Sequence, residues 1–404
     1  MKKLLFKIFL ISFLILPVSL FAFDFGLVIS ANGGVGNIIS EDDIFDFQVD
    51  ILPRFSTLIG DNGELIVSAG FSVGKDEEFF YLPELLRTEF SMRFGNSGIR
   101  AGRINYTDPL SFIANGLFDG VQYFYNSAVG SFRVGAWYTG LQYKKRANIV
   151  MSDPDSTGIS TPVDYDDFLN TYFASKRVFA SFGWEHPSIG ELMRLNAAVI
   201  GQFDLNAADT DYHSQYLILK AAIPFDNLLI EIGGSIEFSQ TVEDDVKFNT
   251  AFAGEIGLYL LFPSKFNSRL SFTSLITSGR TEDSIGAFIP ITGKEYGYIL
   301  KTRIPGLSIF SLNYSSKFNN FLGGLFTVSY FIRNDLGTYN FYPVTVDSEG
   351  FFLGPEISAR ITWGPASDLQ FSLGGGVFFP SLGDAGPSEN IKWRVDLSVI
   401  MSIL

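Results

Sequence analysis

The residues with the clearest chemical potential in this chain are six arginines in its first third, although the whole protein carries a net charge of −14. A guanidinium group stays protonated at physiological pH and holds anions through paired hydrogen bonds. Arginines gathered on one face of neighbouring strands would therefore raise the local concentration of anions. The candidates for such a surface are Arg54, Arg87, Arg93, Arg100, Arg103 and Arg133.

The same arginines also have a purely structural interpretation. Ion pairs with nearby carboxylates would stiffen a β-sheet without binding any solute, or the long side chains would extend toward a membrane interface. The carboxylates available for such pairs are Asp46, Asp50, Glu64 and Glu89. Arg100 and Arg103 fall on opposite faces of a regular strand, so only a bulge at Gly102 would bring both to one face. Both interpretations remain open at this point.

Other chemistries find little support in the sequence. The two histidines, His186 and His213, are expected in connections at opposite ends of the fold, which disfavours a shared metal site. No G-x-S-x-G elbow accompanies them. The run Gly374–Gly376 precedes no helix, so we expect these glycines to make room for a neighbouring strand or the interior rather than to bind phosphate. The sequence therefore predicts no enzymatic activity, no metal and no cofactor.

The elements that carry these residues are strands with one apolar and one polar face. Over residues 391–404, apolar and polar residues alternate, with Ile400 and Leu404 as the exceptions. This period of two is typical of a β-strand with one face against an apolar phase. Similar strands recur along the chain. Their shared parity predicts that the following residues face lipid: Phe47, Val49, Phe90, Phe132 and Val395.

The composition favours a membrane barrel over a soluble β-protein. Hydrophobic residues make up 47% of the chain, and 42 residues are Phe. No segment after residue 22 supplies 18 uncharged apolar residues for a spanning helix. The faces opposite the apolar ones carry Gly, Ser, Thr and charged residues, as in a barrel with a water-filled lumen. We predict an all-β, antiparallel transmembrane barrel of about 18 strands, with 16 as the alternative.

The first 22 residues have the features of a secretory signal peptide. A basic start is followed by an apolar stretch and by a small residue at Ala22. Lys7 within the apolar stretch disfavours an uncleaved anchor. The chain has no cysteine, which suits export into an oxidising compartment. We expect a signal peptide at 1–22, cleaved after Ala22, and a barrel at 23–404 in the outer membrane of a diderm bacterium.

Short and long connections alternate along the chain, as expected for periplasmic turns and external loops. An even number of strands requires residues 296–304 to belong to a long loop, 279–306. This loop is rich in apolar residues, so we expect it to fold into the lumen and narrow it. The other long connection, 140–169, carries several aspartates, and we expect it to stay mostly outside.

Two short motifs resemble those of the alginate-export-like outer-membrane porins. They are R-x-G-R within Ile99–Arg103 and F-D-G-V at Phe118–Val121 on the next strand. Later segments, at 287–290, 307–309 and 330–333 and over the closing region, follow the order of the same family. The resemblance implies an 18-stranded outer-membrane channel lined by charges, with inward-folded loops. It adds Asp119 to the candidate pore-lining residues.

The leading functional hypothesis is a passive diffusion channel for small hydrophilic solutes or saccharides, with a preference for anions, rather than an exporter of alginate itself. The alternative is a non-conducting surface protein whose barrel displays acidic loops for adhesion. The expected partners are outer-membrane lipid, the solutes, and the barrel-assembly machinery and periplasmic chaperones during insertion. The net charge of −14 disfavours nucleic-acid binding.

Overall fold

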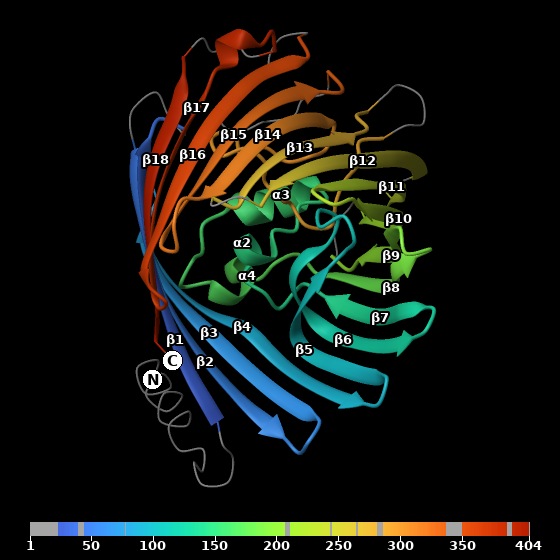
Figure 1. The fold of residues 1–404 in the computed structure, drawn as a ribbon. Helices are drawn as coiled ribbons and strands as arrows, with labels where there is room; N and C mark the ends of the chain where they lie inside the picture. The colour runs from blue at the N-terminus through green and yellow to red at the C-terminus, as the bar shows by residue number, and fades with distance from the viewer. Residues whose placement is uncertain are drawn as a thin grey trace.

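The strands of this protein form one closed cylinder around a filled lumen, as the computed structural model shows (Figure 1). The structure describes residues 23–38, 44–76, 78–206, 211–242, 245–263, 266–280, 286–336, 350–385 and 390–403. The expected signal peptide, residues 1–22, lies outside the described residues.

Eighteen strands make up the sheet, and the described parts of the connections hold three short helices and a 3-10 turn. The first nine strands are β1 (Phe23–Gly36), β2 (Ile44–Ile59), β3 (Gly63–Lys75), β4 (Phe79–Phe94), β5 (Ser97–Thr107), β6 (Asn115–Ser127), β7 (Gly130–Tyr138), β8 (Arg177–Ile189) and β9 (Met193–Asp204). The others are β10 (Asp211–Pro224), β11 (Leu228–Val242), β12 (Val246–Phe262), β13 (Ser268–Thr277), β14 (Leu307–Lys317), β15 (Leu322–Arg333), β16 (Phe352–Ala366), β17 (Leu369–Phe378) and β18 (Lys392–Ile403). The helical elements are α2 (Lys144–Ala147), α3 (Asp153–Ser160), α4 (Phe168–Tyr172) and η1 (Pro380–Leu382).

Each strand pairs antiparallel with the next one in the chain, and the last strand closes the barrel on the first. β1 bonds β2 on one side, where Leu27 is opposite Pro53, and β18 on the other side, where Leu27 is opposite Ile403. The prediction of an 18-stranded antiparallel barrel is confirmed. Residues 296–304 form no strand of the sheet, as predicted, and contribute only an isolated bridge between Tyr296 and Thr302.

The predicted alternation of faces is also present in the wall. In β18, Val395, Leu397 and Met401 are exposed on the outer surface, while the side chain of Asp396 bonds that of Arg394 on the inner face. β2 follows the same rule, since Ile51 is exposed on the outside. Its neighbour Asp50 accepts hydrogen bonds from Ser30 and Ser72 on the two adjacent strands. Within the described residues, no helix is long and apolar enough to cross a membrane.

Three connections fold into the lumen and pack on one another (Figure 1). They are the turn at 108–114, a helical insert at 139–176 that carries α2, α3 and α4, and an inner loop at 286–306. Phe112 of the turn packs edge-on against Phe288 of the inner loop, with ring centroids 6.2 Å apart. The turn is shaped by the carboxylate of Asp108, which accepts the backbone N–H groups of residues 110, 111, 113 and 114.

The prediction for the inner loop is confirmed, whereas the prediction that 140–169 stays mostly outside is wrong. Helix α3 lies within the ring of strands because Asp155, one of the aspartates taken as external, is buried against Arg177 of β8. The Arg177 guanidinium also bonds Asp204 of β9, at 2.8 Å. An aspartate at a helix start usually faces water, but a fully buried cation reverses that preference.

Candidate functional site: a charged cavity in the barrel lumen

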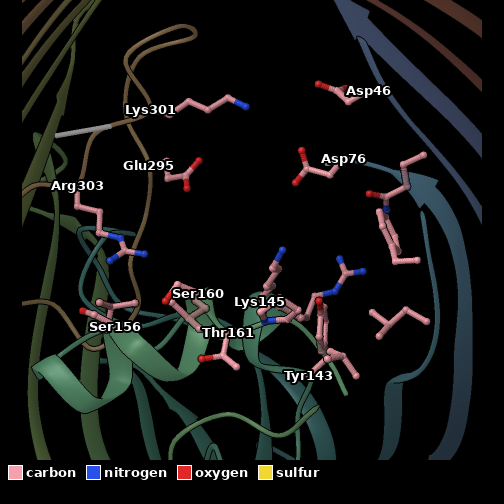
Figure 2. A pocket seen from close by; sticks show the side chains of 18 of the residues that line it. Asp46, Asp76, Tyr143, Lys145, Ser156, Ser160, Thr161, Glu295, Lys301 and Arg303 are labelled. Carbon is pink, nitrogen blue, oxygen red and sulfur yellow. The ribbon is translucent and has the colours of Figure 1, made fainter. Parts of the chain in front are cut away.

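A cavity of about 1550 Å³ lies between the barrel wall and the inward-folded segments. The halves of β2, β3 and β4 that contain Asp46, Lys75 and Phe79 form one side, the inner loop forms another, and helices α2 and α3 form the floor (Figure 2). Charged side chains of both signs line it. They are Asp46, Lys75, Asp76, Glu78, Glu84, Lys145, Arg146, Asp153, Arg280, Glu295, Lys301, Arg303 and Arg394.

The inner loop presents two cations to the cavity. A pair of backbone hydrogen bonds between Tyr296 and Thr302, of 2.8 and 2.9 Å, closes a tight turn. At its end Lys301 adopts a left-handed backbone conformation, with φ at 45°, and its side chain is exposed in the lumen. Within the described part of the chain, neither Lys301 nor Arg303 forms an ion pair. Burial lowers the pKa of Arg303, while Glu295 partly offsets that effect.

Wall carboxylates fasten this loop to the barrel. Glu356 of β16 accepts the backbone N–H groups of residues 298, 299 and 300, at 2.5, 2.9 and 2.9 Å. The hydroxyl of Tyr298 donates to Asp396 of β18. A Cβ atom at Gly374 or Gly376 would lie within 3.0 Å of the Tyr298 side chain, so these two glycines make room for the ring. The expectation that glycines there give space to the interior is confirmed.

The opposite side of the cavity carries mostly carboxylates. Figure 2 shows Asp46 and Asp76 facing Lys301, Glu295 and Arg303 across the open space. Asp46 is itself held on the wall by a bidentate pair with Arg394 of β18, at 2.5 and 2.7 Å. Two cations of the inner loop, with Glu295 beside them, thus face carboxylates of the wall across the open space.

The floor adds further charge from the helical insert. Lys145 points toward the open space (Figure 2), while Arg146 bonds Glu84 of β4 at 2.6 Å. The hydrogen bond to Glu84 raises the pKa of Arg146. Burial, assisted by the charge of Glu84, raises the pKa of Tyr143 to about 12, so its hydroxyl stays protonated. Lys145, the exposed carboxylate of Asp153 and the hydroxyls of α3 remain available to a solute here.

None of the arginines singled out in the sequence lines this cavity. Arg87 and Arg100 share the buried carboxylate of Glu89, at 2.6 and 2.7 Å, which is the wall-stiffening arrangement. Arg133 bonds Glu185 on the next strand at 3.1 Å. Two more of these arginines, Arg54 and Arg93, are exposed and form no ion pair with any described residue. Contact of any of them with a solute stays a prediction.

Arg103 and Asp119 form a bidentate ion pair between β5 and β6, at 2.9 and 2.8 Å. This contact joins the two family-like motifs. The register of β5 with both neighbours is continuous through Gly102, so the bulge that would bring Arg103 beside Arg100 is absent. Alternation therefore puts Arg103 on the other face of β5 from Arg100. Its guanidinium is buried in the barrel wall and also donates to two carbonyl groups, those of residues 85 and 141.

The cavity cations Lys145, Lys301 and Arg303 were not among the residues singled out in the sequence. The apolar composition of the inner loop could have predicted two of them. A loop that folds into the lumen also carries its basic residues, here Lys301 and Arg303, into the lumen. Among the described residues, no group of three or more His, Cys, Asp or Glu side chains is arranged to hold a metal ion.

Comparisons with known proteins place this architecture among bacterial porins. No protein-family model matches the chain, and a search of curated proteins found no match. The structure of Pseudomonas aeruginosa OccK2 (OpdF), in complex with glucuronate, matches with a TM-score of 0.64 and 14% identity over 95% of this chain and 98% of that chain. A BenF-like porin from Pseudomonas fluorescens Pf-5 matches with a TM-score of 0.62 and 10% identity over 94% and 98% of the two chains. The outer membrane protein OpdK from Pseudomonas aeruginosa gives 0.57 and 11% over 95% and 98%.

These likenesses show that the chain has the fold of an outer-membrane porin. At identities of 14% or less they show the fold alone. The alginate-export-like family is not shown by any of them.

Proposed function

We propose that this protein is a passive channel in the outer membrane of a diderm bacterium, and that it admits small hydrophilic solutes with a preference for anions. The observation that carries the proposal is the charged cavity of about 1550 Å³ inside a closed barrel whose outer face is apolar. An apolar outer face of this kind is stable in contact with the acyl chains of a membrane. A lumen lined by unpaired charges is hydrated and attracts ions of the opposite sign.

The preference for anions is argued from the inner loop. Lys301 and Arg303 have no carboxylate partner among the described residues, whereas Asp46 on the facing wall is already paired with Arg394. These two cations are the groups that would hold an anion near the loop. OccK2 was solved with glucuronate, an anionic sugar, and small anions that carry hydroxyl groups are the solute class we propose for this chain.

Planar-bilayer conductance of the purified, refolded chain tests the channel. Discrete openings are expected, together with a reversal potential in a salt gradient that shows anion preference. A silent bilayer with correctly folded protein would contradict the proposal. The alternative would then apply, a non-conducting surface protein, and the observation that favours it is the apolar cluster that the three inward segments form in the lumen.

Finer assignments remain predictions. They are the signal peptide over 1–22, membership of the alginate-export-like family, a solute-contacting role for the arginines of β2 to β7, and insertion by periplasmic chaperones and the barrel-assembly machinery. Mass spectrometry of the protein purified from membranes tests the first of these, because cleavage after Ala22 leaves a chain that starts at Phe23.

A further inference from the structure

Among the described residues, an interval of the barrel wall between β4 and β5 is closed by side chains instead of by a backbone ladder. β4 extends from Phe79 to Phe94 and pairs with β3 along nearly its whole length. Its pairing with β5 covers only Thr88–Phe94. The extracellular half of β4, residues 79–87, therefore has a free edge on the side of β5. We call this interval the seam.

Side chains of the helical insert cap the edge of β4 at the seam. The hydroxyl of Tyr165 accepts the N–H of Tyr81 at 3.3 Å and donates to its carbonyl at 3.0 Å. The two tyrosine rings are stacked 4.4 Å apart. The hydroxyl of Tyr172 donates to the carbonyl of Pro83 at 2.8 Å. Pro83 has no N–H that would be left unpaired at an open edge.

The lower end of the seam is closed by Arg103, whose guanidinium donates to the carbonyl of Leu85 at 2.5 Å and to that of Leu141 in the helical insert at 2.9 Å. In a membrane, each backbone polar group of a wall must find such a partner. Tyr81, Pro83 and the carbonyl of Leu85 find theirs at the seam, but through separate side chains that can leave one by one. A continuous ladder of strand hydrogen bonds opens much less readily.

The two sides of the seam differ in polarity, as the passage of an amphipathic molecule would require. On the outside, Tyr81 and Leu85, which alternate along β4 with cavity-lining residues, have exposed side chains. On the inside, Phe80 and Leu82 of β4 line the charged cavity directly. An apolar path therefore leads from the outer surface through the seam to a cavity whose far side holds cations.

We propose that the seam is a lateral opening, through which small amphipathic molecules pass between the bilayer and the lumen cavity. The apolar body of such a molecule packs against the aromatic and aliphatic side chains of β4, and its anionic head lies toward Lys301 and Arg303. This route goes beyond the proposed aqueous channel, because it connects the lumen with the lipid phase and not only with the two aqueous compartments.

The absence of cysteine in the chain makes single-cysteine labelling a direct test. Leu82→Cys and Phe80→Cys place a thiol on the cavity side of the seam, and Ser358→Cys places one on the inner face of β16, away from the seam. Folded variants in liposomes are treated with a maleimide that is attached to a phospholipid acyl chain and cannot leave the bilayer. Parallel samples receive a charged, water-soluble thiol reagent that enters through the lumen.

The lateral opening predicts that the bilayer-bound maleimide labels at least one of the two β4 thiols, and that Ser358→Cys reacts only with the water-soluble reagent. Adding Tyr172→Phe, which removes the hydroxyl that caps the Pro83 carbonyl, is expected to accelerate the β4 labelling several-fold. The proposal is overturned if neither β4 thiol reacts with the bilayer-bound reagent, or if Ser358→Cys reacts with it equally fast. Labelling does not depend on conductance, so the outcome is independent of the test of the aqueous channel.

Discussion

At the scale of single residues, the orientation of each wall side chain decides what a substitution costs. Val49 has the lipid-facing parity of β2, while Gln48 lines the cavity. An arginine at the bilayer midplane of such a barrel costs about 2–4 kcal/mol. Val49→Arg should therefore lower the folded fraction in lipid vesicles far more than Gln48→Arg does, as measured by urea titration. Equal losses would mean that the two faces of β2 are misassigned.

A second prediction at this scale concerns Arg177, which is fully buried with Asp155 and Asp204. Arg177→Met leaves two buried carboxylates without a cation, and removing one partner of a buried ion pair costs about 3–5 kcal/mol. We expect a corresponding fall in the free energy of unfolding. The matched control replaces all three groups by apolar residues of similar size and should recover much of the loss. A triple variant as unstable as the single one would show that the charges do not hold α3 in the lumen.

The sequence predicted the inner or outer face of many wall residues, because alternation is a local property of a strand. It did not predict their partners. The carboxylate of Glu89 joins Arg87 and Arg100 across two strands, and a contact of this kind depends on register, which no local pattern contains. Nor could it decide whether a bulge at Gly102 brings Arg103 to the face of Arg100; the register of β5 is continuous there, so no bulge does.

At the scale of elements, the inner loop narrows the lumen and its removal is the clearest test. The hydroxyl of Thr277 at the end of β13 accepts the N–H of Leu307 at 2.9 Å, so a short glycine linker can replace the residues between them. Single-channel conductance of the folded deletion variant should rise, since the loop fills part of the lumen. Unchanged conductance would remove this loop from the conducting path.

Of the two long connections, the sequence predicted the position of one and not of the other. The apolar residues of 286–306 correctly predicted that this loop folds into the lumen, because the exposure of apolar side chains to water is unfavourable. The helical insert looked external because it is acidic, yet long-range pairs with Arg177 and with the edge of β4 bring it inside. Such an insert is part of the wall. Shortening it should destabilise the barrel, whereas loops of most barrels tolerate deletion.

At the scale of the whole molecule, ion selectivity depends on where charges lie rather than on their sum. The chain has a net charge of −14, but fixed charges act in a lumen over about one Debye length, roughly 8 Å at physiological salt. The cations that border the cavity should therefore outweigh more distant carboxylates. We expect wild type to prefer anions, and the triple variant Lys145→Gln, Lys301→Gln, Arg303→Gln to shift the reversal potential in a salt gradient toward cation preference.

The matched control for this prediction is the pair Arg93→Gln and Arg133→Gln, which removes two arginines that do not line the cavity. If the cavity sets the selectivity, this control changes the reversal potential much less than the triple variant does. The opposite ranking would mean that the arginines of β4 and β7 form the selective region, as the sequence alone suggested. A wild-type channel that prefers cations and does not respond to the triple variant would show that the carboxylates of the facing wall, Asp46 and Asp76, dominate the field in the lumen.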